Sequence, residues 1–155
     1  MDKPNIDELL ASTDVNGSII ELDNYVCELC EWGESLDKLS VPQKAFYYNQ
    51  ELEREINNGG FEQYFSNSSG SYAHETVESL NAIGASRTAA ILYDANEQFP
   101  GGLVPKSTEK REELMLDLWP DGNSLWEELE TRFFAYEDNL NALHLAFVKA
   151  NRESF

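Results

Sequence analysis

Apolar residues recur at steps of three and four along most of this sequence, and this spacing restricts what the chain can fold into. Between residues 18 and 34, for example, Ile19, Leu22 and Val26 fall on one face of a helix. No stretch shows the sustained alternation of apolar and polar residues, rich in β-branched residues, that is typical of strands. The pattern predicts an all-α fold, an irregular multi-helix bundle.

Capping and stop residues divide the chain into further helices. Ser40 followed by Pro42 is typical of a helix start, and Gly59 and Gly60 are expected to end that helix after Asn57. A short helical turn over residues 61–65 follows. We expect three more helices over residues 71–85, 86–99 and 107–119, with Gly84 placed to end the first and Ser107 or Thr108 to cap the last.

The last predicted helix, over residues 125–149, is also the longest. Its main apolar face consists of Leu125, Trp126, Leu129, Phe133, Tyr136, Leu140, Leu143 and Phe147. Phe134, Leu145 and Val148 lie outside that face, so the C-terminal half of this long C-terminal helix is apolar on two sides. Such a helix is either central or meets a second subunit, and we predict a homodimer through the second face.

The sign of the net charge excludes direct binding of nucleic acid. The 155 residues include 29 acidic and 11 basic ones, which gives a formal net charge of −18. Because proteins bind DNA and RNA mainly through Lys and Arg on phosphates, such a chain is repelled by polyanions and by anionic membranes. The same field attracts basic partners, and we interpret the acid excess as functional.

Length and composition predict one domain over residues 1–155, since 41% hydrophobic residues can fill one core. The amino terminus lacks a basic segment followed by an apolar one, and no stretch has the roughly 20 apolar residues that span a bilayer. We therefore expect a cytoplasmic protein.

Residues with reactive side chains give no consistent sign of catalysis or of a cofactor. Cys27 and Cys30 form a C-x-x-C pair, but a zinc site usually needs four ligands and the two histidines lie far away in the sequence. His74 stands beside Glu75 without any nucleophile motif. We expect core or boundary thiols, an ordinary structural or surface His74, a packed His144, no metal and no enzyme activity.

Carboxylates on helix faces indicate a binding function instead of a catalytic one. Acidic residues one helical turn apart lie roughly 6 Å from each other, on the scale of neighbouring phosphates along a DNA strand. They could engage the Arg and Lys that a DNA-binding protein uses on phosphates. The candidate partner-binding residues are Glu21, Glu28, Glu31, Glu34, Asp37, Glu51, Glu55, Glu112, Glu113, Glu127, Glu128 and Glu130.

One segment, NNGGFEQYFSNSSG, resembles the signature of a bacterial family of DNA-mimic proteins. The matching residues are Asn58, Gly59, Gly60, Phe61, Gln63, Tyr64, Phe65, Asn67 and Gly70. The resemblance covers roughly residues 40–150 and implies an acidic all-α dimer that mimics double-stranded DNA and keeps a helix-turn-helix transcription factor from its operator. Such a factor reads half-sites about 34 Å apart, so a two-fold dimer would present matching acidic patches.

The signature residues themselves favour a structural role over a binding role. Glycines allow a positive φ after a helix, and the aromatic residues anchor the next turn in the core. A phosphate-cradling loop is the alternative, but no Lys or Arg accompanies the glycines.

Two other functions stay open. A small acidic protein can be an inhibitor or immunity-type protein of a nuclease or of another basic nucleic-acid-binding protein. An enzyme that acts on a cationic substrate would depend on His74 and the carboxylates.

Overall fold

The computed structural model describes residues 2–155, which contain helices and turns and no strand. The α-helices are α1 (Ile6–Ala11), α2 (Val15–Leu29), α3 (Val41–Ser66), α4 (Ala73–Ala82), α5 (Ser86–Asn96), α6 (Thr108–Leu118), α7 (Ser124–Phe134) and α8 (Leu140–Ala150). Short 3-10 turns lie at Glu31–Gly33, Leu36–Lys38, Ser68–Tyr72, Pro100–Gly102 and Arg152–Ser154. This confirms the predicted all-α class. Within residues 2–155, no helix is both long and apolar enough to cross a membrane.

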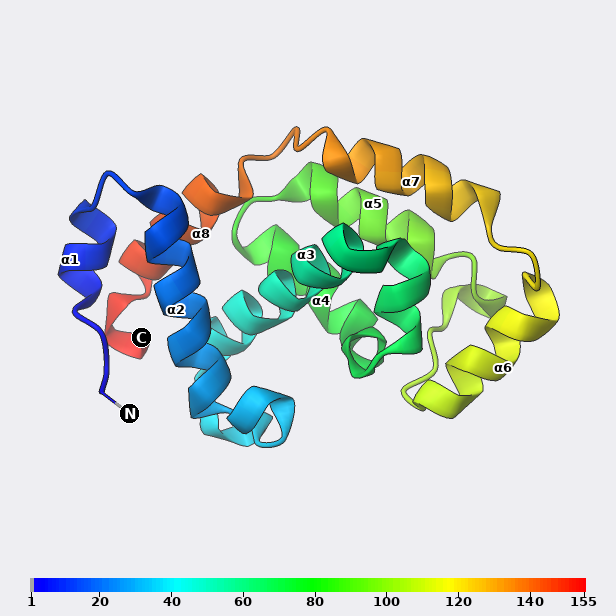
Figure 1. The fold of residues 1–155 in the computed structure, drawn as a ribbon, viewed down its shortest axis with the longest axis horizontal. Helices are drawn as coiled ribbons and strands as arrows, with labels where there is room; N and C mark the ends of the chain where they lie inside the picture. Colours follow the sequence, from blue (N-terminus) through cyan, green and yellow to red (C-terminus); the bar gives the residue numbers. More distant parts are fainter. Residues whose placement is uncertain (1) are drawn as a thin grey trace.

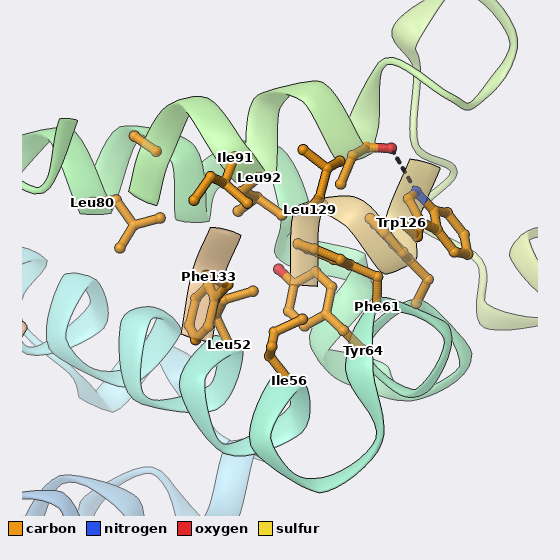
Figure 2. Close-up of a cluster of buried hydrophobic side chains, with 14 of the residues drawn as sticks. Leu52, Ile56, Phe61, Tyr64, Leu80, Ile91, Leu92, Trp126, Leu129 and Phe133 are labelled. Carbon is orange, nitrogen blue, oxygen red and sulfur yellow. Dashed lines mark hydrogen bonds between the residues drawn. The ribbon is translucent and has the colours of Figure 1, made fainter. Parts of the chain in front are cut away.

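Helix α3 runs through the middle of the molecule and takes part in both of its buried clusters (Figure 1). Its first half contributes Phe46 and Tyr47 to a cluster with α1, α2 and α8. Its middle contributes Leu52 and Ile56 to a larger cluster with α4, α5 and α7, which Figure 2 shows. Phe147 packs against both clusters, so the two parts of the core are joined.

The predicted start of α3 is confirmed, but its end lies further along the chain. The Ser40 hydroxyl accepts a hydrogen bond from Gln43 N (3.2 Å), and Gln43 Oε1 accepts one from Ser40 N (2.9 Å), which forms a capping box. At Gly60, φ is +73° and ψ is −166°, and the helix kinks there. After the kink it continues to Ser66, so the glycines bend the helix instead of ending it.

The prediction of a single long C-terminal helix is wrong, because the chain breaks between α7 and α8. Tyr136 has a left-handed φ of +45°, and the Asn139 side chain caps α8. Asp138 Oδ2 accepts hydrogen bonds from Thr88 N (2.8 Å) and Thr88 Oγ1 (3.0 Å), which holds the break against the start of α5. Apolar spacing continues across the break, and this continuity is what made the two helices look like one.

The second apolar face of the predicted helix is largely used inside the chain. Val148 is fully buried and Leu145 is half-buried, and both pack in the cluster with α1 and α2. Phe134 alone of the three remains exposed, at 48%. The surface expected to form a homodimer is therefore mostly covered by the protein's own helices.

Other boundaries follow the sequence with two exceptions. Gly84, with φ of +84°, follows the end of α4, and the Ser107 hydroxyl caps α6, both as predicted. Helix α1 was not predicted. Helix α2 ends five residues before residue 34, because Glu31 and Trp32 adopt left-handed backbone conformations.

Candidate protein-binding surface

Most carboxylates among residues 2–155 form no ion pair. Seven ion pairs occur within residues 2–155, and they engage seven of the 29 acidic residues in the chain. Two candidates are among the seven: Glu31 pairs with Lys38 (2.9 Å), and Glu51 pairs with Arg54. Because interspersed opposite charges stabilise helices, a surface with so few pairs gives up stability and keeps its negative field.

Two further candidates form hydrogen bonds inside the molecule. Glu55 accepts one from Asn67 Nδ2 (2.6 Å), and Glu130 accepts one from Phe61 N (2.8 Å), the first amide after the Gly60 kink. Like Glu31 and Glu51, these residues hold parts of the chain together. None of the four is as available to a partner as the sequence suggested.

The other eight candidates are exposed and form two groups. Four lie on α2 and the turns that follow it: Glu21, Glu28, Glu34 and Asp37. Four lie on α6 and the first half of α7: Glu112, Glu113, Glu127 and Glu128. In Figure 1, α2 lies toward one end of the long axis, whereas α6 and the start of α7 lie at the other. The structure thus divides the candidates between an α2 group and an α6–α7 group.

Further exposed acids extend the α6–α7 group beyond the candidates. Glu109 and Asp117 lie on α6, and Glu62 lies on the second half of α3. Glu62 and Glu112 line the same pocket of about 280 Å³, whose apolar wall includes Trp119. The charge of Glu62 alone would make it a candidate partner-binding residue. It was not one of the candidates because it lies in the signature segment, to which the sequence assigned a structural role.

The histidines and cysteines have structural surroundings. His74 Nε2 accepts a hydrogen bond from Val104 N (3.1 Å), and His144 is fully buried, where burial lowers its pKa to about 4. Cys27 and Cys30 are buried and free, and burial raises the pKa of Cys27 to about 12. The predicted packed His144 is confirmed. Among residues 2–155, no three His, Cys, Asp or Glu side chains gather as metal ligands would.

The signature segment builds the core and joins it to α6. Phe61, Tyr64 and Phe65 are fully buried, as expected from a structural motif. A Cβ on Gly70 would lie 2.9 Å from Arg111 Nε and 2.9 Å from the Cα of Phe65, so no side chain fits there. The glycine thereby lets the buried Arg111 reach the backbone of the signature loop.

Comparison with known proteins agrees with this signature. The family model described as DMP19-like protein matches residues 37–151, which include the signature segment and all helices from α3 to α8. Neither the curated proteins nor the solved structures yielded a match. Helices α1 and α2, with part of the α2 group of acids, lie outside the matched range. Because the match spans most of the chain, this protein belongs to the DMP19-like family, the DNA-mimic family that the signature segment predicted.

Proposed function

We propose that this protein binds the DNA-binding surface of a helix-turn-helix transcription factor and thereby prevents the factor from binding DNA. It acts by occupation and not by catalysis, as expected of a family whose members bind proteins. The observation that carries this proposal is that the carboxylates of the α2 and α6–α7 groups are exposed and form no ion pair among residues 2–155.

Electrostatics explains why such a surface competes with DNA. The Arg and Lys side chains with which a DNA-binding protein neutralises phosphates can also pair with carboxylates of similar spacing. DNA and the mimic therefore compete for one set of cations. The field of the mimic also accelerates encounter with a basic partner. Its reach is about 8 Å at physiological salt, so the complex weakens as salt rises.

The homodimer and the cytoplasmic location stay predictions. A two-fold dimer would present one acidic surface to each of the two DNA-binding domains of a dimeric factor, and the exposed Phe134 is the remaining part of the apolar face expected at the dimer interface. Sedimentation at micromolar concentration tests the dimer, and a monomer under those conditions would remove it from the proposal.

Capture followed by competition tests the proposed function. The immobilised protein is exposed to native bacterial lysate, bound proteins are identified by mass spectrometry, and the captured factor is purified and placed on its operator. We expect the protein to displace the factor from its operator in a gel shift, and we expect its direct binding to the factor, measured without DNA, to weaken as salt rises. A ternary complex of factor, DNA and this protein would contradict mimicry.

A matched variant separates binding by the acids from binding by other surfaces. Changing Glu112, Glu113, Glu127 and Glu128 together to Gln keeps the shape and removes the charge of the α6–α7 group. We expect this variant to require about tenfold more protein for release. If the captured protein is instead a nuclease whose cleavage is blocked, the inhibitor function replaces the one proposed here.

A further inference from the structure

An aromatic pocket of about 230 Å³ lies where the turn after α2, the first half of α3 and the signature loop meet. Its aromatic and acidic lining consists of Trp32, Tyr47, Tyr48, Tyr72, Glu34 and Glu51. Among the residues that the structure describes, no lysine or arginine lines it. The pocket therefore combines aromatic rings with two carboxylates, and two nearby cations, Lys106 and Arg54, contact its lining residues Tyr72 and Glu51 without lining it themselves.

The backbone at the edge of this pocket is strained. Glu31 and Trp32 have φ values of +52° and +58°, which cost roughly 1–3 kcal/mol each for residues other than glycine. Gly33 continues the turn with φ of +100°, and a Cβ there would lie 2.6 Å from the Tyr47 hydroxyl. The Trp32 side chain lies at this strained turn, lines the pocket and is 65% exposed, so it contributes little to the core.

The aromatic wall is rigid and already attracts one cation. Tyr48 and Tyr72 stack with ring centroids 4.9 Å apart, and Lys106 Nζ lies 5.5 Å from the centroid of Tyr72. Since this ring is covered by Tyr48 and Lys106, the aromatic surface left for a ligand is mainly the exposed Trp32. Indole is also the side chain whose face binds cations best.

The two carboxylates differ in their surroundings. Glu34 is exposed and has no ion-pair partner, whereas Glu51 is half-buried and pairs with Arg54, which Asp23 shares. Burial raises the pKa of Glu51, and Arg54 opposes that shift. Because Arg54 also pairs with Asp23, a second cation in the pocket would meet a carboxylate that shares its only ion-pair partner with another acid.

We propose that this pocket binds the guanidinium of an arginine side chain. The volume is below the roughly 300–1,000 Å³ of pockets that enclose whole small molecules, and it suits one side chain. A guanidinium stacks on an aromatic face and pairs with carboxylates through two parallel hydrogen bonds. The identification of this arginine as one of the captured basic protein rests on the proposed function. The affinity of the pocket for a guanidinium rests only on its lining residues.

Fluorine NMR of protein labelled with 5-fluorotryptophan tests this site without any partner or DNA. The three tryptophans give separate resonances, and Trp32→Phe identifies that of Trp32. Acetyl-arginine methylamide is titrated at constant ionic strength, with the neutral citrulline derivative as its isostere. We expect a saturable shift of the Trp32 resonance with the arginine compound, and stationary resonances of Trp119 and Trp126.

Charge variants test the role of the carboxylates. Glu34→Gln combined with Glu51→Gln is expected to weaken the apparent affinity about tenfold or more. Glu34→Gln alone, at an exposed position that leaves folding intact, is expected to weaken it measurably. Glu127→Gln combined with Glu128→Gln, at the other end of the molecule, is expected to leave it unchanged.

Three results would overturn the assignment: no saturable shift of the Trp32 resonance, an equal response to the citrulline compound, or equal weakening by the Glu127 and Glu128 variant. A lysine derivative that binds as tightly would contradict the choice of a guanidinium. If the pocket binds arginine but the protein never displaces a factor from its operator, the arginine site is retained and the proposed function is rejected.

Discussion

Arg111 is a fully buried arginine whose partners are neutral oxygens. Nε donates to Phe65 O (2.8 Å), and the two terminal nitrogens donate to Asn67 O (2.8 Å) and Pro105 O (2.8 Å), among others. No carboxylate within residues 2–155 forms an ion pair with it. The fork of donors therefore holds the signature loop against the segment that precedes α6.

Replacing Arg111 with lysine should destabilise the protein although the charge is kept. A lysine has three donors on one atom and cannot reach oxygens on both sides of the fork, so buried carbonyls lose their partners. We expect the free energy of unfolding in urea to fall by about 3 kcal/mol. Arg87→Lys, at an exposed ion pair with Glu137, is the control and should change it by less than about 0.5 kcal/mol.

His144 should make the free energy of unfolding depend on pH between its folded and its unfolded pKa. Its Nδ1 lies 2.9 Å from Leu140 O, and its Nε2 has no hydrogen-bond partner, so the buried ring is neutral. Burial lowers its folded pKa to about 4, against roughly 6.5 when unfolded. The unfolded state then binds more protons between these values, so stability falls as pH falls through that window.

The free energy of unfolding is predicted to fall by about 1 kcal/mol between pH 6.5 and 5.5 because of His144. Urea denaturation of the protein and of His144→Gln at both pH values measures it, and the difference should vanish in the variant. All other ionisable groups are present in both proteins, so the comparison isolates His144. Equal pH dependence of the two proteins would show that the ring is not kept neutral by burial.

At the scale of the element, Glu130 of α7 caps the second segment of α3. Gly60 breaks the helical hydrogen bonding, and Glu130 Oε1 accepts the hydrogen bond of the first free amide, Phe61 N. Glu130→Ala should therefore lower the free energy of unfolding by about 1 kcal/mol, as the loss of a helix cap does. Binding of the captured partner should change less than about twofold, since this carboxylate faces its own chain.

Glu127→Ala is the matched control for Glu130→Ala, since it lies one turn earlier on the exposed side of α7. It should leave stability nearly unchanged and weaken partner binding. The reverse outcome, in which Glu130 governs affinity and Glu127 governs stability, would return Glu130 to the binding surface.

The sequence predicted those elements whose ends are set by neighbouring residues. Ser40 and Ser107 cap helices through amides three residues away, so their signals are local. The break between α7 and α8 depends on Asp138 and on Thr88, fifty residues away, and no local pattern contains that contact. The left-handed turn at Trp32 is different, because its hydrogen bonds are local: Gly33 N and Ser35 N both donate to Cys30 O, and apolar spacing alone did not indicate this turn.

In the candidate site, too, the sequence predicted the features that depend on neighbouring residues and missed those that depend on tertiary contacts. Exposure of Glu21 and Glu112 follows from helical periodicity, which is local. The engagement of Glu130 with an amide 69 residues away is tertiary, as is the division of the acids between two ends of the molecule. Aromatic and acidic residues that form the arginine pocket likewise come from separate segments.

At the scale of the whole molecule, the single domain is a prediction that α3 supports by contributing to both clusters. Breaking either cluster would expose apolar residues of α3 that the other cluster does not cover, so we expect one unfolding transition. Trp119 and Trp126 report on the larger cluster by fluorescence in a Trp32→Phe background, and Cys27 reports on the other by thiol labelling. Two separate urea midpoints would indicate two domains.

The net charge should act on stability and on binding with opposite signs. Glu113 has Glu109 and Asp117 one helical turn away on either side, an arrangement of like charges that costs a few tenths of a kcal/mol for each pair. Neutralising Glu112, Glu113, Glu127 and Glu128 together should therefore leave the free energy of unfolding unchanged or raise it by up to about 1 kcal/mol.

The same four changes should weaken partner binding and flatten its dependence on salt, because fewer charges remain to be screened. Urea denaturation and a salt series of binding measurements on one pair of proteins test both effects. Glu75→Gln, which removes an ion pair with Lys106, is the contrasting control and should lower stability without lowering affinity. If the variant with all four changes binds the partner as tightly as the original protein, the four acids are only a solvated surface. In that case binding does not explain why the protein keeps like charges that lower its stability.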